Sequence, residues 1–347
     1  MKKKRFVALI AVLCLIFTLC ACGSQPAATS DSEKQAAPAA DKTDKKEPIP
    51  LIVADVTVEG SPNMIAFHHF EEIVEERSNG EIDVQLYPAS QLGGQKDLVE
   101  GLRLGTVDIC NSMGGILSAY LPEVQVFDLP FIWTDKEHFF RVLDGEVGTM
   151  FKEDLFPQYG FEGLAFFDGG VRSIYNAVRP IYTPDDVKGL KIRVPEIAMY
   201  IDFVEALGGS ATPISTGEVY SALQTGIVDG VENAPGFVEN WKHYEICKYY
   251  SYTNHMMAPD MVLMSTKVYD KLSDEQIALV KECMKEAETL QRKTWVEQEA
   301  EVVDRLKEYG MEFNECDLPL FKEAVQPVWQ KYESIIGKEL IDKVANG

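Results

Sequence analysis

From residue 51 onward, apolar and polar positions follow two different periods, which predicts that short strands alternate with helices. Leu51 to Val56 has the nearly unbroken apolar character of a buried strand, and residues 82–86 alternate with the period of two expected of a half-buried strand. Between them, apolar side chains recur at helical spacing after Ser61-Pro62, a pair typical of a helix N-terminus. This order favours α/β layers with mostly parallel strands.

The second half of the chain repeats the order of strand and helix. Residues 191–194 predict a strand, and residues 196–207 predict a helix that ends at Gly208-Gly209. Ser215 and Glu218 have the spacing of a capping box, which predicts a further helix that ends at Gly226. The same α/β layering is therefore expected in both halves.

One stretch, Ser273 to Tyr309, predicts a single long helix. It is charged and amphipathic, lacks Gly and Pro, begins with the capping spacing of Ser273 and Gln276, and is followed by Gly310. At a rise of 1.5 Å per residue it would exceed about 50 Å, which is longer than one small domain is wide. Such a helix must brace two lobes or project into solvent.

The N-terminus has the form of a bacterial lipoprotein signal. Lys2 to Arg5 is basic, and Phe6 to Leu19 is apolar apart from one threonine, a length that suits a signal peptide and is too short to span a membrane. The sequence LCAC at residues 19–22 resembles a lipoprotein box. We therefore predict a signal peptide at 1–21, a lipid on Cys22, and anchoring at the outer face of the cytoplasmic membrane. An ordinary secretory signal with a chance cysteine is the alternative.

Residues 22–50 are rich in Ala, Pro, Ser, Asp and Lys and nearly lack large apolar residues. Such a segment cannot offset its ordering entropy by burial, so it predicts a flexible tether. The folded part is expected to begin near Leu51.

Composition and charge narrow the class of protein. The 347 residues are 46% hydrophobic and 25% charged, which excludes disorder of the whole chain. Asp and Glu number 55 against 33 Lys and Arg, for a formal net charge of −22. Nucleic-acid binding, which needs a basic surface, is therefore not expected. An anionic ligand would have to be attracted by a few local cations.

The usual catalytic and cofactor motifs are absent from the sequence. It contains no GxGxxG, Walker loop, GxSxG or HExxH, so neither a nucleotide cofactor nor the common hydrolase arrangements are expected. His68, His69, Glu71 and Glu72 come closest to a metal cluster, but no further ligand motif accompanies them. A solvated helix face is the favoured interpretation, and no metal site is expected.

The cysteines beyond the predicted signal and lipid site lack any CxxC spacing. They are Cys110, Cys247, Cys283 and Cys316. This spacing fits neither zinc binding nor a disulfide framework. Free thiols are favoured, and a single disulfide bond remains open.

Two arginines are candidates for anion binding. Arg193 lies in a predicted strand on the same face as Lys191, where a buried guanidinium requires a partner anion. Its planar donor fork matches a carboxylate, either of a ligand or of a neighbouring acidic side chain, and the residues alone leave both open. Arg172 follows Gly169-Gly170, and glycine lets a backbone approach a ligand closely.

Short motifs occur in a fixed order between residues 87 and 233. They are YPASQLG at 87–93, FDLPF at 127–131, RPI at 179–181, GLKIRVP at 189–195, LGG at 207–209, TP at 212–213, EVYSALQTG at 218–226, and DGVEN at 229–233. This series closely resembles the extracytoplasmic solute receptors of tripartite ATP-independent periplasmic (TRAP) transporters, the DctP family. The resemblance covers about residues 51–335.

The resemblance implies a two-lobed α/β fold like that of periplasmic binding proteins, with strand hinges, a ligand cleft and a long helix spanning both lobes. Lobe I would comprise residues 51–170 and about 260–298. Lobe II would comprise about 171–259 and 299–347. The chain would then be a receptor rather than an enzyme, and it would deliver its ligand to the integral membrane subunits of the transporter.

The resemblance also implies roles for individual residues. Arg193 takes the position of the family's carboxylate clamp, and Arg172 that of a second, supporting arginine. Asn233, in the DGVEN motif, matches an amide that touches the ligand carboxylate.

The chain departs from the sialic-acid branch of the family. Glu196 replaces an asparagine, and Met113 stands where that branch has an acidic residue. Sialic acid is therefore not the expected ligand, and Glu196, if it faces the cleft, would accept hydrogen bonds from sugar hydroxyls. Trp241, Phe237 and Tyr220 are expected either to form an apolar wall of the site or simply to pack.

The functional hypothesis is an extracytoplasmic receptor for a small organic carboxylate, either a uronate or another hydroxylated monocarboxylate. The first alternative is a lipid-anchored hydrolase or lyase acting on an acidic sugar, with Glu196 or Glu232 as its base. The second is a structural or adhesive lipoprotein, which would need no arginine in a cleft.

Overall fold

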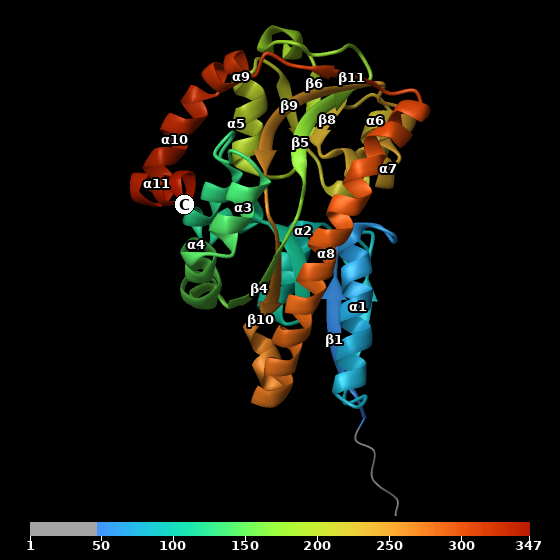
Figure 1. The fold of residues 1–347 in the computed structure, drawn as a ribbon, viewed down its shortest axis with the longest axis vertical. Coiled ribbons are helices and arrows are strands. Elements are labelled where there is room, and N and C mark those ends of the chain that lie inside the picture. The colour runs from blue at the N-terminus through green and yellow to red at the C-terminus, as the bar shows by residue number, and fades with distance from the viewer. Residues whose placement is uncertain (1–46) are drawn as a thin grey trace, which may run out of the picture. The chain divides into compact units, whose positions relative to one another are not determined.

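Two β-sheets organise the part of the chain that the computed structural model describes, residues 47–347 (Figure 1). These residues belong to one compact unit. The predicted signal peptide at 1–21, the lipid site at Cys22 and most of the predicted tether at 22–50 lie outside them.

The first sheet has the strand order β2-β1-β3-β10-β4. Its strands are β1 (Ile49–Ala54), β2 (Ile82–Tyr87), β3 (Ile109–Met113), β4 (Phe161–Phe167) and β10 (Asp260–Ser265). The first three are parallel to one another, and β10 runs antiparallel to both β3 and β4. Strand β1 begins two residues before the predicted start of the folded part.

The second sheet has the order β11-β9-β5-β8-β6-β7. Its strands are β5 (Val171–Asn176), β6 (Lys191–Val194), β7 (Ser210–Pro213), β8 (Gly230–Asn233), β9 (Tyr249–Met257) and β11 (Glu312–Glu315). Across both sheets, five strand pairs are parallel and four antiparallel, so the expectation of mostly parallel strands was too strong. The antiparallel pairs all involve β5 or β10. The chain enters the second sheet at β5, after β4, and returns to the first sheet at β10, after β9.

Helices cover both sheets. They are α1 (Pro62–Arg77), α2 (Gln95–Leu104), α3 (Lys136–Leu143), α4 (Glu146–Thr149), α5 (Ala198–Ala206), α6 (Val219–Gln224), α7 (Pro235–Asn240), α8 (Asp274–Glu308), α9 (Leu318–Ala324), α10 (Gln326–Ile336) and α11 (Lys338–Asn346). The apolar faces of these helices pack on the sheets in the buried clusters that form the core.

Two of the three predicted caps are confirmed. Ser61 Oγ accepts a hydrogen bond from the backbone N–H of Met64, and Ser273 forms a capping box with Gln276. The predicted capping box at Ser215 is wrong, because a short 3₁₀ turn precedes α6 and the Ser215 side chain caps nothing. Its hydroxyl instead lies against Gly94, where an added Cβ would stand 2.5 Å from Ser215 Oγ.

The predicted long helix is confirmed as α8, 35 residues that run past both sheets (Figure 1). It packs against α1 and β4 near the first sheet and against α7 near the second. Where the chain passes between the sheets, Gln291 is fully buried, with Oε1 accepting from Asp168 N at 2.8 Å and Nε2 donating to Asp168 O at 2.9 Å. The middle of α8 is thereby fixed to the crossing segment.

Two crossing segments connect the sheets, one between β4 and β5 and the other between β9 and β10. In the first, Gly170 has φ +73°, and a Cβ there would stand 2.5 Å from the ring of Trp295 on α8 and 2.7 Å from Ala234 Cβ. A Cβ on Gly169 would stand 2.6 Å from Ala258 O in the second segment. Both glycines therefore allow a close approach that a side chain would prevent.

The last three helices contact both predicted lobes. Helix α9 contacts β9, α10 contacts α5 and the 3₁₀ turn Pro122–Asp128, and α11 contacts that same turn. His138 on α3 lies 2.8 Å from Val344 O through Nε2. The sequence assigned all of 299–347 to lobe II, and the exact lobe boundaries stay a prediction.

Gly170→Ala tests the close packing at the crossing segment. We expect it to lower the free energy of unfolding by about 2–4 kcal/mol, since it adds a steric clash to the strain of a positive φ. Gly189 is the matched control, because it has φ +77° but nothing within 4 Å of an added Cβ. Gly189→Ala is expected to cost about 1 kcal/mol in the same urea titration. Equal losses would contradict the packing explanation.

Candidate functional site

A narrow cavity of about 30 Å³ lies between the two sheets. Elements of lobe I contribute Val56, Thr57, Gln95, Asn111, Met113 and Asp260. Elements of lobe II contribute Arg172, Arg193, Pro195, Thr216, Asn233, Phe237 and Trp241. The cavity therefore brings together five of the seven residues expected to bind ligand, namely Arg193, Arg172, Asn233, Phe237 and Trp241.

Arg193 is a buried cation at one end of this cavity. It is 2% exposed, and its Nε and Nη2 donate to Ile214 O at 2.8 and 2.6 Å. No acidic side chain of residues 47–347 lies within 4 Å of its guanidinium. The described residues therefore do not form the structural ion pair that the sequence left open as an alternative. Burial lowers the pKa of Arg193 to about 10, and the group still carries its charge at neutral pH.

Arg172 is also buried, but its charge is balanced. Its Nε and Nη2 bind the two carboxylate oxygens of Glu232 at 2.7 and 2.8 Å, and Nη2 also donates to Glu232 O at 2.9 Å. Burial alone would raise the pKa of Glu232, but Arg172 and then His255 outweigh it and hold that pKa below its usual value. His255 Nε2 lies 3.4 Å from Glu232 Oε2. Arg172 can therefore offer donors to the cavity without adding net charge.

Asn233 presents its amide to the same cavity. Its Oδ1 accepts from the N–H of Ala234 at 2.9 Å, which leaves the Nδ2 donor without a partner in the described part of the chain. The Tyr250 hydroxyl donates to Asn233 O at 3.0 Å and holds the end of β8 in place. The three nitrogen donors predicted for carboxylate binding therefore line one cavity.

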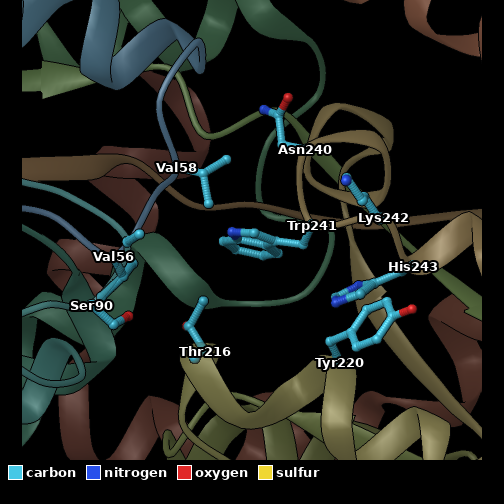
Figure 2. Close-up of a pocket in the computed structure, with 11 residues that line it drawn as sticks. Val56, Val58, Ser90, Thr216, Tyr220, Asn240, Trp241, Lys242 and His243 are labelled. Carbon is cyan, nitrogen blue, oxygen red and sulfur yellow. The ribbon is translucent and has the colours of Figure 1, made fainter.

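Phe237 and Trp241 form an apolar wall. Their rings stack with centroids 4.9 Å apart, and Trp295 of α8 packs behind Phe237 at 5.4 Å. Trp241 also faces a second, more open pocket of about 370 Å³, in which Figure 2 shows its indole beside Val58 and across from Tyr220.

Tyr220 lines only this outer pocket. Figure 2 shows its ring on the same side of the pocket as His243. Its hydroxyl donates to Glu245 Oε2 at 2.5 Å. The structure therefore does not place Tyr220 with the arginines.

Glu196 lies at the rim of the cleft rather than in the cavity. Its side chain is 34% exposed, and Oε1 is 3.1 Å from Lys96 Nζ of α2, so the pair connects the two lobes across the opening. It borders a separate surface hollow together with Gly94 and Ser215. Binding of ligand hydroxyls by Glu196 stays a prediction that this arrangement does not support.

Polar side chains of lobe I also line the cavity, and the sequence did not predict them. Thr57, Asn111 and Asp260 all line the cavity and are buried. The available signal was polar residues next to apolar strand residues, as in ICNSM at 109–113 and DMVLM at 260–264. Burial raises the pKa of Asp260 to about 6.

The remaining candidates outside the cavity behave as surface or core groups. His68 lies 2.9 Å from Glu59 and 3.1 Å from Glu71 on an exposed helix face, and residues 47–347 contain no cluster of three or more His, Cys, Asp or Glu side chains placed to hold a metal ion. Within the same range, no helix is both long and apolar enough to cross a bilayer. All four cysteines there are free thiols, as favoured: Cys110, Cys247, Cys283 and Cys316.

The Arg172–Glu232 pair makes a prediction about stability. Arg172→Met should lower the free energy of unfolding by about 3–5 kcal/mol, because it leaves Glu232 buried without its counterion. Arg172→Met/Glu232→Gln should recover most of that loss, and urea titrations of ligand-free protein measure both. A double variant as unstable as Arg172→Met alone would contradict a charge-balanced pair.

Comparison with known proteins places this chain in a known family. A family model described as "Bacterial extracellular solute-binding protein, family 7" (DctP) matches residues 53–335. The sialic acid-binding periplasmic protein SiaP of Vibrio cholerae is 32% identical over 274 residues, which cover 79% of this chain and 85% of that protein.

Two crystal structures of similar proteins contain bound acids. A TRAP periplasmic solute-binding protein from Sulfitobacter sp. NAS-14.1, with bound β-D-galacturonate, is 36% identical with a TM-score of 0.83 and covers 86% of this chain and 100% of its own. Another from Sulfurospirillum deleyianum, with bound succinate, is 30% identical with a TM-score of 0.81 and covers 85% of this chain and 97% of its own. Similar folds thus hold a hydroxylated monocarboxylate in one protein and a dicarboxylate in another.

Proposed function

The chain belongs to the DctP family of bacterial extracellular solute-binding proteins, the receptors of TRAP transporters, and we propose that its ligand is a uronate or another hydroxylated monocarboxylate bound at Arg193. As a member of this family it is an extracytoplasmic receptor that binds a small organic acid and works with integral membrane subunits. The ligand class, the binding residues and the lipid anchor are the proposed parts.

The observation that carries the proposal is the unbalanced charge of Arg193. Buried charges in proteins are ordinarily paired, since desolvation is costly. Ile214 O holds Nε and Nη2 and so fixes the plane of the guanidinium, while Nη1 has no partner among residues 47–347. A ligand carboxylate would supply the missing anion and a charge-assisted hydrogen bond.

Arg172 and Asn233 complete the proposed carboxylate site. Glu232 cancels the charge of Arg172, so the site contributes one net positive charge, that of Arg193. The single unpaired positive charge on this wall of the cavity matches one carboxylate. Phe237 and Trp241 would cover the apolar face of a sugar ring.

A ligand held by both lobes would favour the closed arrangement. The cavity takes side chains from both, so a bound acid gains contacts only when the lobes are together. The two crossing segments would absorb the rotation between the lobes. Exclusion of water would then strengthen the attraction between Arg193 and the carboxylate.

The site is poorly suited to the alternative of a hydrolase or lyase. Glu232 is held ionised by Arg172, which lowers its basicity, and Glu196 lies outside the cavity. A structural or adhesive role would leave the buried charge of Arg193 without purpose. The positions of Glu232 and Glu196 and the unpaired charge of Arg193 therefore favour a receptor that binds its ligand without changing it.

Arg193→Met tests the proposed clamp. By calorimetry with D-glucuronate and D-galacturonate, we expect affinity to fall by about 30-fold or more for whichever acid the wild type binds, because a buried charge-assisted contact is lost. Ligand-free Arg193→Met should be as stable as the wild type or more so, because an unpaired buried charge is removed. Arg103→Met, which removes an exposed arginine, serves as the control. Wild-type affinity in Arg193→Met would refute the clamp.

Cys22→Ser tests the proposed lipid anchor. The variant should lose metabolic labelling by radioactive palmitate and move from the membrane fraction to the soluble extracytoplasmic fraction. Cys20→Ser, two residues earlier and inside the predicted signal peptide, should keep both the label and the membrane location. A Cys22→Ser protein that remains labelled and membrane-bound would show that the lipid is not on this residue.

A further inference from the structure

The wall of the cavity that lobe I contributes is acidic. Asp260, the first residue of β10, lines the cavity and pairs across the sheet with Met113 at the end of β3. Its Oδ2 accepts from Asn63 Nδ2 at 3.0 Å. Asp55 and Asn111 lie close to it, and the negative charge of Asp55 contributes, after burial, to the raised pKa of Asp260.

Two buried acceptor atoms in this group lack partners. Asn111 is 1% exposed and lines the cavity, and its Oδ1 has no hydrogen-bond partner among residues 47–347. The same holds for Oδ2 of Asp55, which is buried just behind. A buried polar atom without a partner is costly, so an acceptor lining a binding cavity indicates a donor on the ligand.

The cation and the acids of this cavity do not neutralise each other. Among the described residues no ion pair joins Arg193 to Asp260, since Arg193 is held by Ile214 O and Asp260 by Asn63. The cavity is therefore polarised, with nitrogen donors and a net positive charge on the wall from lobe II and carboxylate and amide oxygens on the wall from lobe I.

Building on the proposed function, we propose that Asp260, supported by Asp55 and Asn111, selects sugar acids with one carboxylate and rejects dicarboxylates. Hydroxyl groups on the ligand would donate to these oxygens. A second carboxylate has no proton to donate and would face Asp260 at short range in a cavity of low dielectric. Because relatives of similar fold hold galacturonate or succinate, the fold alone does not decide between these ligands.

Calorimetry of the wild type at pH 8, where Asp260 is ionised, gives the first test. The probes are D-glucuronate and D-galacturonate with one carboxylate, and D-glucarate and succinate with two. We expect the better monocarboxylate to bind at least about 50-fold more tightly than either dicarboxylate. This measurement needs no variant, so it does not depend on whether a substitution folds.

Asp260→Asn gives the second test. The substitution keeps the shape and an acceptor oxygen while removing the charge, so the ratio of the two ligand classes should fall at least about fivefold, mainly through tighter binding of D-glucarate. Asp55→Asn should act in the same direction and less strongly. Asp154→Asn, at an exposed position of the first lobe, should leave the ratio unchanged.

The outcomes separate this inference from the proposed function. If the wild type binds a dicarboxylate as tightly as the uronates, or if Asp260→Asn leaves the ratio unchanged, the selection by Asp260 is wrong while the receptor for organic acids stands. If none of the four acids binds, the proposed ligand class fails and the inference fails with it.

Discussion

The arrangement of the binding cavity depends on one buried positive charge, that of Arg193, which has no ion-pair partner among residues 47–347. The chain keeps this guanidinium on the short strand β6, between β7 and β8, and orients it with a single backbone oxygen, Ile214 O. The guanidinium is thus held in one orientation, and its charge is available to a ligand. A protein with a net charge of −22 can still attract an anion to this point because the attraction is local and shielded from solvent.

The neighbouring residues isolate that charge rather than add to it. Glu232 balances the charge of Arg172, so this second arginine contributes hydrogen-bond donors at fixed positions but no net charge. Asp260 and Asp55 belong to the other lobe and lie beyond ion-pair distance of Arg193. The two halves of the site thus have opposite character, and a ligand with an acid group and several hydroxyls suits both at once.

The architecture makes such a divided site possible. Each wall is built at strand ends of a separate sheet, and the sheets are joined by two extended segments and by α8. Gln291 and Trp295 on α8 contact the segment that contains Gly169 and Gly170, so the helix and the crossing strands meet where rotation between the lobes would occur. The glycines are required there because backbone and ring approach more closely than any side chain would allow.

The sequence predicted correctly those helices and strands that depend on contacts between residues close together in the chain. The cap at Ser273 and the absence of Gly and Pro predicted α8, and the strand pattern predicted β6, the strand that contains Arg193. Predictions from the sequence were wrong where the position of a side chain depends on residues far away in the chain. Ser215 forms no cap because its segment meets Gly94 of the other lobe, and Glu196 pairs with Lys96, a hundred positions away, instead of entering the cavity. Asp260 was missed for the same reason, since its neighbours Asn63 and Asp55 come from the other end of lobe I.

The most direct test of carboxylate binding at Arg193 is a crystal structure of the protein with bound D-glucuronate or D-galacturonate. We expect the carboxylate to lie within hydrogen-bonding distance of the Arg193 guanidinium, with ring hydroxyls directed toward Asp260 and Asn111. A carboxylate bound elsewhere, with Arg193 still contacting only Ile214 O, would contradict it.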